Sequence, residues 1–121
     1  MSTRRPLTAA FRDAARGVLR LVAAERNAKV HLAATAAVVA AAAWTRFDAL
    51  RWAVLALAIG LVWAAEAANT ALERLADAAC PEHSGLVRDA KDIVAGGVLL
   101  ASVAAAATGA ALFLPLWCRH L

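Results

Sequence analysis

The chain has 121 residues, of which 63% are hydrophobic and 18% charged, and its mean hydropathy is +0.64. This composition is far more apolar than that of a soluble domain of this size, and it predicts an all-α integral membrane protein with one domain over residues 1–121. The net charge of +4 is concentrated near the N-terminus, but in so apolar a chain a basic segment favours lipid over nucleic acid, and we expect no nucleic-acid partner.

The N-terminal segment is basic and amphipathic. Residues 1–29 contain seven of the thirteen Lys and Arg residues but only two acids, Asp13 and Glu25. Within it, residues 7–24 form an apolar face at helical spacing, which predicts a helix lying in the membrane interface rather than spanning the bilayer. Arginines recur at four-residue spacing beside that face, at Arg12, Arg16 and Arg20. The basic excess places this segment on the cytoplasmic side, against anionic lipid.

Three transmembrane helices are predicted after the surface helix. They cover residues 28–45, 50–78 and 86–118, and the last contains 26 residues without a charge. A turn with Pro81 and Gly85 separates the second from the third. Cys80 and Cys118 lie at opposite ends of the last helix, so we expect no disulfide between them. The distribution of Lys and Arg puts residues 1–29 and the 74–92 loop in the cytoplasm.

The second transmembrane segment carries a stripe of polar side chains. The stripe follows an uncharged run and consists of Glu66, Asn69, Glu73 and Asp77. The spacing places all four on one helix face. Each ionisable group at bilayer depth costs on the order of 3 kcal/mol, so a stripe of them indicates a functional site. Carboxylates beside an amide suggest divalent-metal or proton chemistry.

The residues near this stripe suit phosphate chemistry. The sequence has no P-loop, so nucleotide chemistry would depend on side chains and metal. Lys91 and Asp92 begin the last helix, where a lysine can reach a phosphate, and Glu25 lies where the surface helix meets the first span. Magnesium favours one or two protein carboxylates plus phosphate oxygens, a set that supports phosphoryl transfer.

Spacing alone leaves three classes of protein open. A kinase uses these groups for phosphoryl transfer. A small proton-coupled exporter would also need a membrane glutamate, although such proteins commonly have four spans and do not need Lys91 and Asp92 after a polar loop. A non-catalytic interaction subunit would usually pair its membrane acids with membrane bases, and the predicted second span has none near Glu66.

A longer motif resembles the signature of the bacterial diacylglycerol kinase family, which includes undecaprenol kinases. The matching residues run from Glu66-Ala-Ala-Asn69 through Thr-Ala-Leu-Glu73, followed by Asp77, Pro81-Glu82 and Ala90-Lys91-Asp92, with Gly17 and Glu25-Arg26-Asn27 upstream. The resemblance implies a homotrimeric kinase of the bacterial inner membrane. Such a kinase would move the γ-phosphate of ATP-Mg to a lipid hydroxyl on the cytoplasmic side, at active sites shared between subunits.

The resemblance also implies roles for the catalytic and metal-binding residues. Glu66 would be the base for the lipid hydroxyl, and Asn69 would orient the reacting groups. Glu25 and Glu73 would hold the magnesium ion that bridges the ATP phosphates, and Lys91 would contact those phosphates. The simpler alternative for Asn69 is an interhelical hydrogen bond.

Three further acids have implied roles: Asp77 and Asp92 would serve the nucleotide or Lys91 itself, and Glu82 would serve the nucleotide. Their alternatives are local: Asp92 caps its helix or pairs with Lys91, and Glu82 is a solvated loop acid.

The lipid substrate implied first is diacylglycerol, with undecaprenol as the alternative. The loop reads Pro81-Glu82-His83-Ser84, where many members have Pro-Glu-Tyr-His, so a nucleotide contact from its histidine is open. Residues 25–32 resemble the undecaprenol kinase branch more closely, since the diacylglycerol branch often has a glutamate at the position of His31. The alternative is that His31 is a plain interfacial residue, in which case it would not indicate which lipid is the substrate.

Overall fold

The structure is a computed structural model that describes residues 4–24 and 26–119, and over these ranges it is built from helices without a strand. The helices are α1 (Leu7–Ala24), α2 (Arg26–Trp44), α3 (Ala49–Ala79) and α4 (Gly85–Cys118). Their ends fall within two residues of the boundaries predicted from the sequence. The apolar runs and the turn residues between them account for this agreement.

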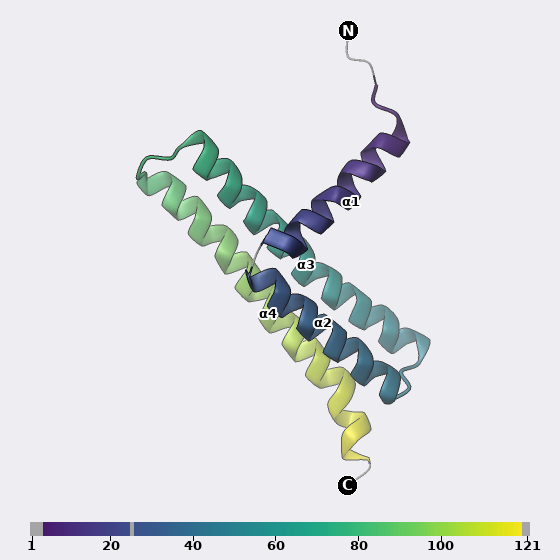
Figure 1. Ribbon diagram of the computed structural model, residues 1–121. Helices are drawn as coiled ribbons and strands as arrows, with labels where there is room; N and C mark the ends of the chain where they lie inside the picture. The colour runs from purple at the N-terminus through teal and green to yellow at the C-terminus, as the bar shows by residue number, and fades with distance from the viewer. Residues whose placement is uncertain (1–3, 25, 120–121) are drawn as a thin grey trace.

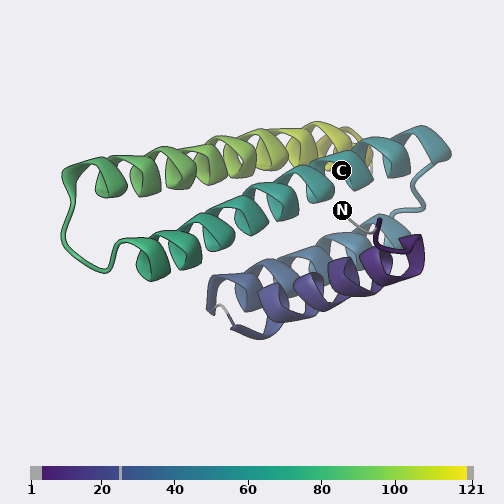
Figure 2. The ribbon, with the colours of Figure 1, turned by 90° about the horizontal axis from the view of Figure 1, so that it is seen from above.

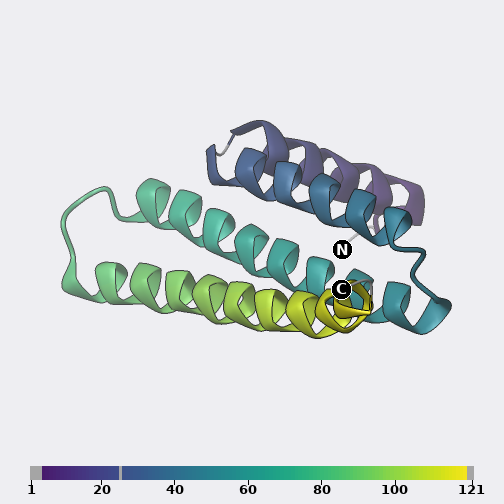
Figure 3. The same ribbon diagram turned by 90° about the horizontal axis from the view of Figure 1, so that it is seen from below.

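Helices α3 and α4 form a long antiparallel hairpin that dominates the fold (Figure 1). α2 packs against the half of the hairpin that is distant from the α3–α4 loop, so the loop end projects beyond the start of α2 (Figures 2 and 3). α1 diverges from α2 and leaves the bundle obliquely (Figure 1). The last turns of α3, which carry Glu73 and Asp77, therefore lie beyond α2, whereas Glu66 lies against it.

The apolar core lies at the end of the bundle opposite the α3–α4 loop. Its buried residues are Ala42, Phe47, Leu55 and Phe113. The turn from α2 to α3 supports this core because Phe47 N–H donates to the Ala42 carbonyl over 3.2 Å and Arg46 N–H to the Ala43 carbonyl over 3.2 Å. This is the Schellman pattern, which requires a left-handed residue after the helix, and Arg46 occupies it with a φ of 58°.

Two helices, α3 and α4, are long and apolar enough to cross a membrane. Many of their apolar side chains are exposed in the single chain; Leu57, for example, is 76% exposed. Such surfaces fit contact with lipid or with other subunits. α2 is shorter, at 19 residues, and the third transmembrane helix remains a prediction.

α1 is strongly amphipathic but packs lightly on the rest of the chain. Large apolar side chains such as Leu7 and Phe11 are exposed on it. On its polar face, Asp13 forms ion pairs with Arg16 and with Arg5, which precedes the helix. This pattern is that of a helix whose apolar face is covered by something outside the chain, and it supports the prediction of an interfacial helix.

Candidate active site

The most deeply buried acid of the described chain is Glu66, in the middle of α3. Its side chain is only 8% exposed. Nε2 of His31, on α2, lies 2.8 Å from Oε1 of Glu66. A buried carboxylate is costly without a polar or charged partner, and His31 supplies that partner from a neighbouring helix.

Other side chains of α2 and α3 hold His31 in place. The indole Nε1 of Trp63 donates a 3.0 Å hydrogen bond to Oγ1 of Thr35, and that hydroxyl donates over 2.7 Å to the backbone carbonyl of His31. The rings of His31 and Trp63 meet edge to face, with centroids 6.3 Å apart. The sequence identified Glu66 but left the role of His31 open, because pairing across two helices depends on their relative rotation.

Asn69 lies one turn after Glu66 and has an oxygen without a partner. Its Oδ1 is buried and accepts no hydrogen bond from the described residues. The alternative of interhelical hydrogen bonding through this oxygen is therefore not seen in the single chain. Buried polar atoms rarely remain unpaired, so an orphaned acceptor in a candidate site fits a ligand or metal that is bound there.

A second cluster lies at the loop end of the hairpin. Nζ of Lys91 donates a 2.8 Å hydrogen bond to Oδ1 of Asp77, which joins α4 to α3. Glu73, one turn before Asp77, also acts electrostatically on Lys91. Asp92 is exposed and is not the ion-pair partner of Lys91; Asp77 takes that place.

The loop beside Lys91 forms an open, polar cavity of about 310 Å³. Its lining includes Asp77, Glu82, His83, Arg88 and Lys91. Three of the residues that the resemblance implied for the nucleotide, namely Asp77, Glu82 and Lys91, thus share one surface. The cavity also contains Arg88, whose possible role the sequence did not indicate.

The two clusters lie apart within one chain. Glu66 and Asp77 are separated by eleven residues of continuous helix, which corresponds to about 16 Å along the axis. Asn69 and Glu73 lie between them on the same face. The single chain therefore presents the predicted site residues as a line along α3 rather than as one compact centre.

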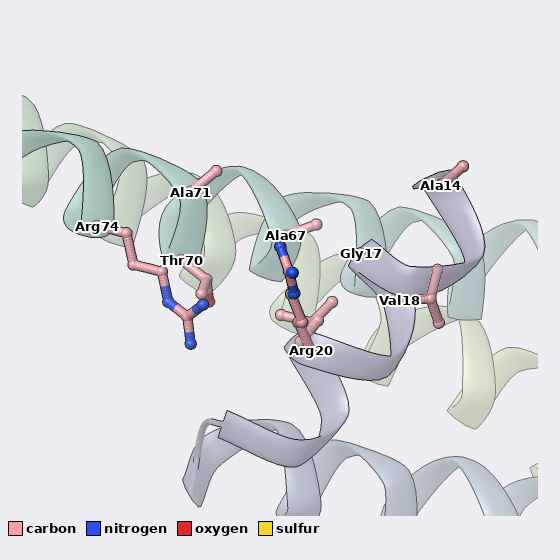
Figure 4. Close-up of a pocket in the computed structure, with 9 residues that line it drawn as sticks. Ala14, Gly17, Val18, Arg20, Ala67, Thr70, Ala71 and Arg74 are labelled. Atoms are coloured by element: carbon pink, nitrogen blue, oxygen red, sulfur yellow. The ribbon is translucent and has the colours of Figure 1, made fainter. Parts of the chain in front are cut away.

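A larger cavity of about 410 Å³ lies between α1 and α3 (Figure 4). Its walls are mostly apolar, with small residues such as Gly17 and Ala67. Figure 4 shows the guanidinium groups of Arg20 and Arg74 at this cavity, with Thr70 next to Arg74. The sequence did not single out this arrangement, because it depends on the angle at which α1 crosses α3.

The predicted metal site is only partly described. Glu25 lies outside the described residues, and Glu73 is half-buried on α3. Over residues 4–24 and 26–119, no three His, Cys, Asp or Glu side chains converge closely enough to hold a metal ion. The oxygen donors on α3, Asn69 Oδ1 and the Glu73 carboxylate, are of the type that magnesium prefers. The pairing of Glu25 with Glu73 remains a proposal.

Comparison with known proteins places this site in a family. The family model of the prokaryotic diacylglycerol kinases matches residues 12–113. The chain belongs to the prokaryotic diacylglycerol kinase family. The match includes α2, α3, nearly all of α4 and the whole polar stripe, so the resemblance inferred from the motif is confirmed.

Two relatives of this chain are named as lipid kinases. A diacylglycerol kinase from Synechocystis sp. is 41% identical over 110 residues, which cover 90% of this chain and 63% of that protein. An undecaprenol kinase from Bacillus subtilis is 33% identical over 105 residues, which cover 87% of this chain and 85% of that protein. This chain therefore matches less than two thirds of the length of the Synechocystis protein. No solved structure matches the chain.

Membership of the diacylglycerol kinase family favours the first of the three classes that the spacing left open. Both relatives carry the names of kinases, which agrees with the predicted enzyme class. Neither name supports an exporter or a non-catalytic subunit.

Proposed function

We propose that the protein is an ATP- and Mg²⁺-dependent lipid kinase that phosphorylates a lipid hydroxyl at the cytoplasmic face of the bacterial inner membrane. The observation that carries the proposal is the buried Glu66, held at the start of a line of oxygen ligands on a membrane helix. Membership of the kinase family supplies the reaction class.

In this mechanism Glu66 accepts the proton of the lipid hydroxyl. The lipid oxygen then forms a bond to the γ-phosphorus of ATP while the bond to the β,γ-bridging oxygen breaks, and ADP leaves. General-base catalysis of this kind requires an ionised carboxylate within hydrogen-bond reach of the hydroxyl. Phosphoryl transfer otherwise depends on positioning and on neutralising charge, and Lys91 carries the positive charge suited to the ATP phosphates.

Magnesium would be held by Glu73 and Glu25, with Asn69 orienting the reacting groups beside them. When bound, the ion neutralises phosphate charge. The orphaned Oδ1 of Asn69 and the carboxylate of Glu73 lie one turn apart on α3, which supports an oxygen-rich site there. Asp77, Glu82 and Asp92 would serve the nucleotide from the loop end.

The lipid would approach through the cavity between α1 and α3. Its apolar walls suit a hydrocarbon chain, and its lining residues Ala67 and Thr70 stand next to Glu66 on α3. The guanidinium groups of Arg20 and Arg74 would attract the phosphate that the lipid receives. Diacylglycerol, giving phosphatidic acid, is the first candidate substrate, and undecaprenol is the alternative.

We also propose that the protein is a homotrimer with active sites shared between subunits. Two observations support this: the separation of about 16 Å between the Glu66 and Asp77 ends of the stripe, and the extensive apolar surface exposed on the single chain. A site assembled between chains would bring groups from different helices together without requiring any one chain to enclose both substrates.

The proposed function is tested with purified protein in detergent micelles, labelled ATP and magnesium. One reaction receives diacylglycerol, one undecaprenol and one no lipid, and the labelled products are separated. We expect lipid-dependent transfer of label, with the better substrate identified by kcat/KM. ATP hydrolysis that is independent of both lipids, with no labelled lipid, would contradict the proposal.

The matched control is Glu66→Gln. The amide keeps the shape of the side chain but cannot accept the proton, so kcat should fall by roughly 10² to 10⁴. Gel filtration should show unchanged assembly, because the substitution removes a buried charge. Lipid phosphorylation by this variant at a near-native rate would exclude Glu66 as the base.

A further inference from the structure

The contact between His31 and Glu66 lies between two helices that otherwise touch little. α2 packs less extensively on α3 than α3 does on α4. At this position Nε2 of His31 is 2.8 Å from Oε1 of Glu66, and among the described residues Glu66 has no other ion-pair partner within 4.0 Å. The orientation of the Glu66 carboxylate is therefore set mainly by one side chain from α2.

His31 is itself constrained, as a positioning group must be. Its backbone carbonyl accepts from Thr35, its ring meets that of Trp63, and Trp63 donates to Thr35. These contacts come from both helices, and the edge-to-face contact with Trp63 bears on the imidazole ring itself. The lining of the adjacent cavity, about 170 Å³ in volume, includes His31 and, from α4, Ser102. The imidazole thus contacts two side chains of α3, Glu66 and Trp63, and the cavity beside it extends to α4.

We propose that His31 is a positioning residue for Glu66, a role that rests on the proposed kinase function. The contact with Nε2 occupies Oε1 and leaves Oε2 free to accept the proton of the lipid hydroxyl. His31 does not touch the reacting atoms; it acts through the carboxylate.

The experiment compares His31→Gln with His31→Asn. The amide nitrogen of glutamine reaches about as far as Nε2 of histidine, whereas that of asparagine is too short to keep the contact with Glu66. Both variants remain polar and neutral, so they differ mainly in reach. Ser102→Ala serves as the control, because it changes the same cavity without affecting the His31–Glu66 contact.

We expect His31→Asn to lower kcat by about 10- to 100-fold, the range that misplacement of a catalytic group by about an ångström produces. The KM for ATP should stay within about twofold, because the nucleotide groups lie at the other end of the stripe. His31→Gln should recover most of the lost kcat, and Ser102→Ala should behave as wild type. Thermal unfolding in detergent is measured for each variant, since a purely structural role would lower stability and spare kcat.

A double-mutant cycle completes the test. If His31 acts only through the carboxylate, His31→Asn should change the residual rate of Glu66→Gln by less than about twofold. Wild-type kcat in His31→Asn, equal loss in the Asn and Gln variants, or a full additional loss in the Glu66→Gln background would each overturn the proposal. Should His31→Asn fail to assemble, His31→Met, which keeps the length but lacks the nitrogen, replaces it. A wild-type protein that phosphorylates no lipid would instead contradict the proposed function.

Discussion

Asn69 and Glu73 are two residues of α3 that place oxygen atoms in the proposed metal site. Asn69 contributes a buried oxygen that no described donor satisfies, while the carboxylate of Glu73 is half-buried and lies near Lys91. An oxygen ligand in such a place is costly unless something binds to it. In the proposed mechanism, a divalent cation with the ATP phosphates is that ligand.

Glu73→Gln should therefore raise the magnesium concentration needed for half-maximal rate. The amide keeps an oxygen but loses the negative charge on which the affinity for Mg²⁺ depends, so a shift of about tenfold is expected. The rate is measured against free magnesium at constant ATP. Asp89→Asn, which neutralises an exposed acid of α4 to which no role in the site is assigned, provides the comparison. Superimposable titrations of Glu73→Gln and wild type would remove Glu73 from the metal site.

The four helices illustrate how local sequence determines an element while its neighbours determine its contacts. The apolar runs and the turn with Pro81 and Gly85 predict where the helices begin and end, and in the structure Asp48 caps the N-terminus of α3. The αL conformation of Arg46 has no such signal, because glycine is the usual residue at this position of a Schellman turn. The backbone turns left-handed at Arg46 because Phe47 packs back into the core against Ala42.

Arg46→Gly should consequently stabilise the protein. A left-handed backbone costs a residue with a side chain roughly 1–2 kcal/mol, and glycine removes this cost. Glycine also makes the unfolded chain more flexible, which lowers stability by a smaller amount, so the free energy of unfolding should rise by about 0.5–1 kcal/mol. Unfolding by denaturant in detergent measures the change. Arg88→Gly, at an exposed arginine within α4, should have the opposite sign because glycine weakens a helix. A loss of stability in Arg46→Gly would mean that the arginine side chain contributes more than the backbone strain costs.

For the molecule as a whole, the residues that could be predicted are those whose signal is local. The polar stripe on α3 and the all-helical fold follow from spacing and composition. The contact of His31 with Glu66, the ion pair of Lys91 with Asp77, and the cavity between α1 and α3 depend on how the helices rotate and cross. No periodicity along one helix encodes those relations, so only the three-dimensional arrangement reveals them.

The proposed sharing of sites between chains leads to a prediction for mixed trimers. If Glu25 comes from one subunit and Glu66 from its neighbour, trimers that combine Glu25→Ala chains with Glu66→Gln chains should contain one intact site. The two inactive proteins are unfolded, mixed and refolded in detergent. Activity should then rise well above that of either variant refolded alone.

The composition of the trimers is verified by mass, with each variant refolded alone as the control. Mixed trimers that are no more active than those controls would show that each site is built within one chain.

The α3–α4 hairpin also bears on the order in which the chain acquires its structure. The loop between these helices is only residues 80–84, and the two helices share the largest interface of the described chain. Closing so short a loop costs little chain entropy, so the hairpin should form early and α2 should dock on it later. Substitutions between α3 and α4 would then slow folding, whereas those that loosen α2 would mainly accelerate unfolding. Since the His31–Glu66 contact depends on the docking of α2, Glu66, the proposed base, would reach its working orientation only in the last step of folding.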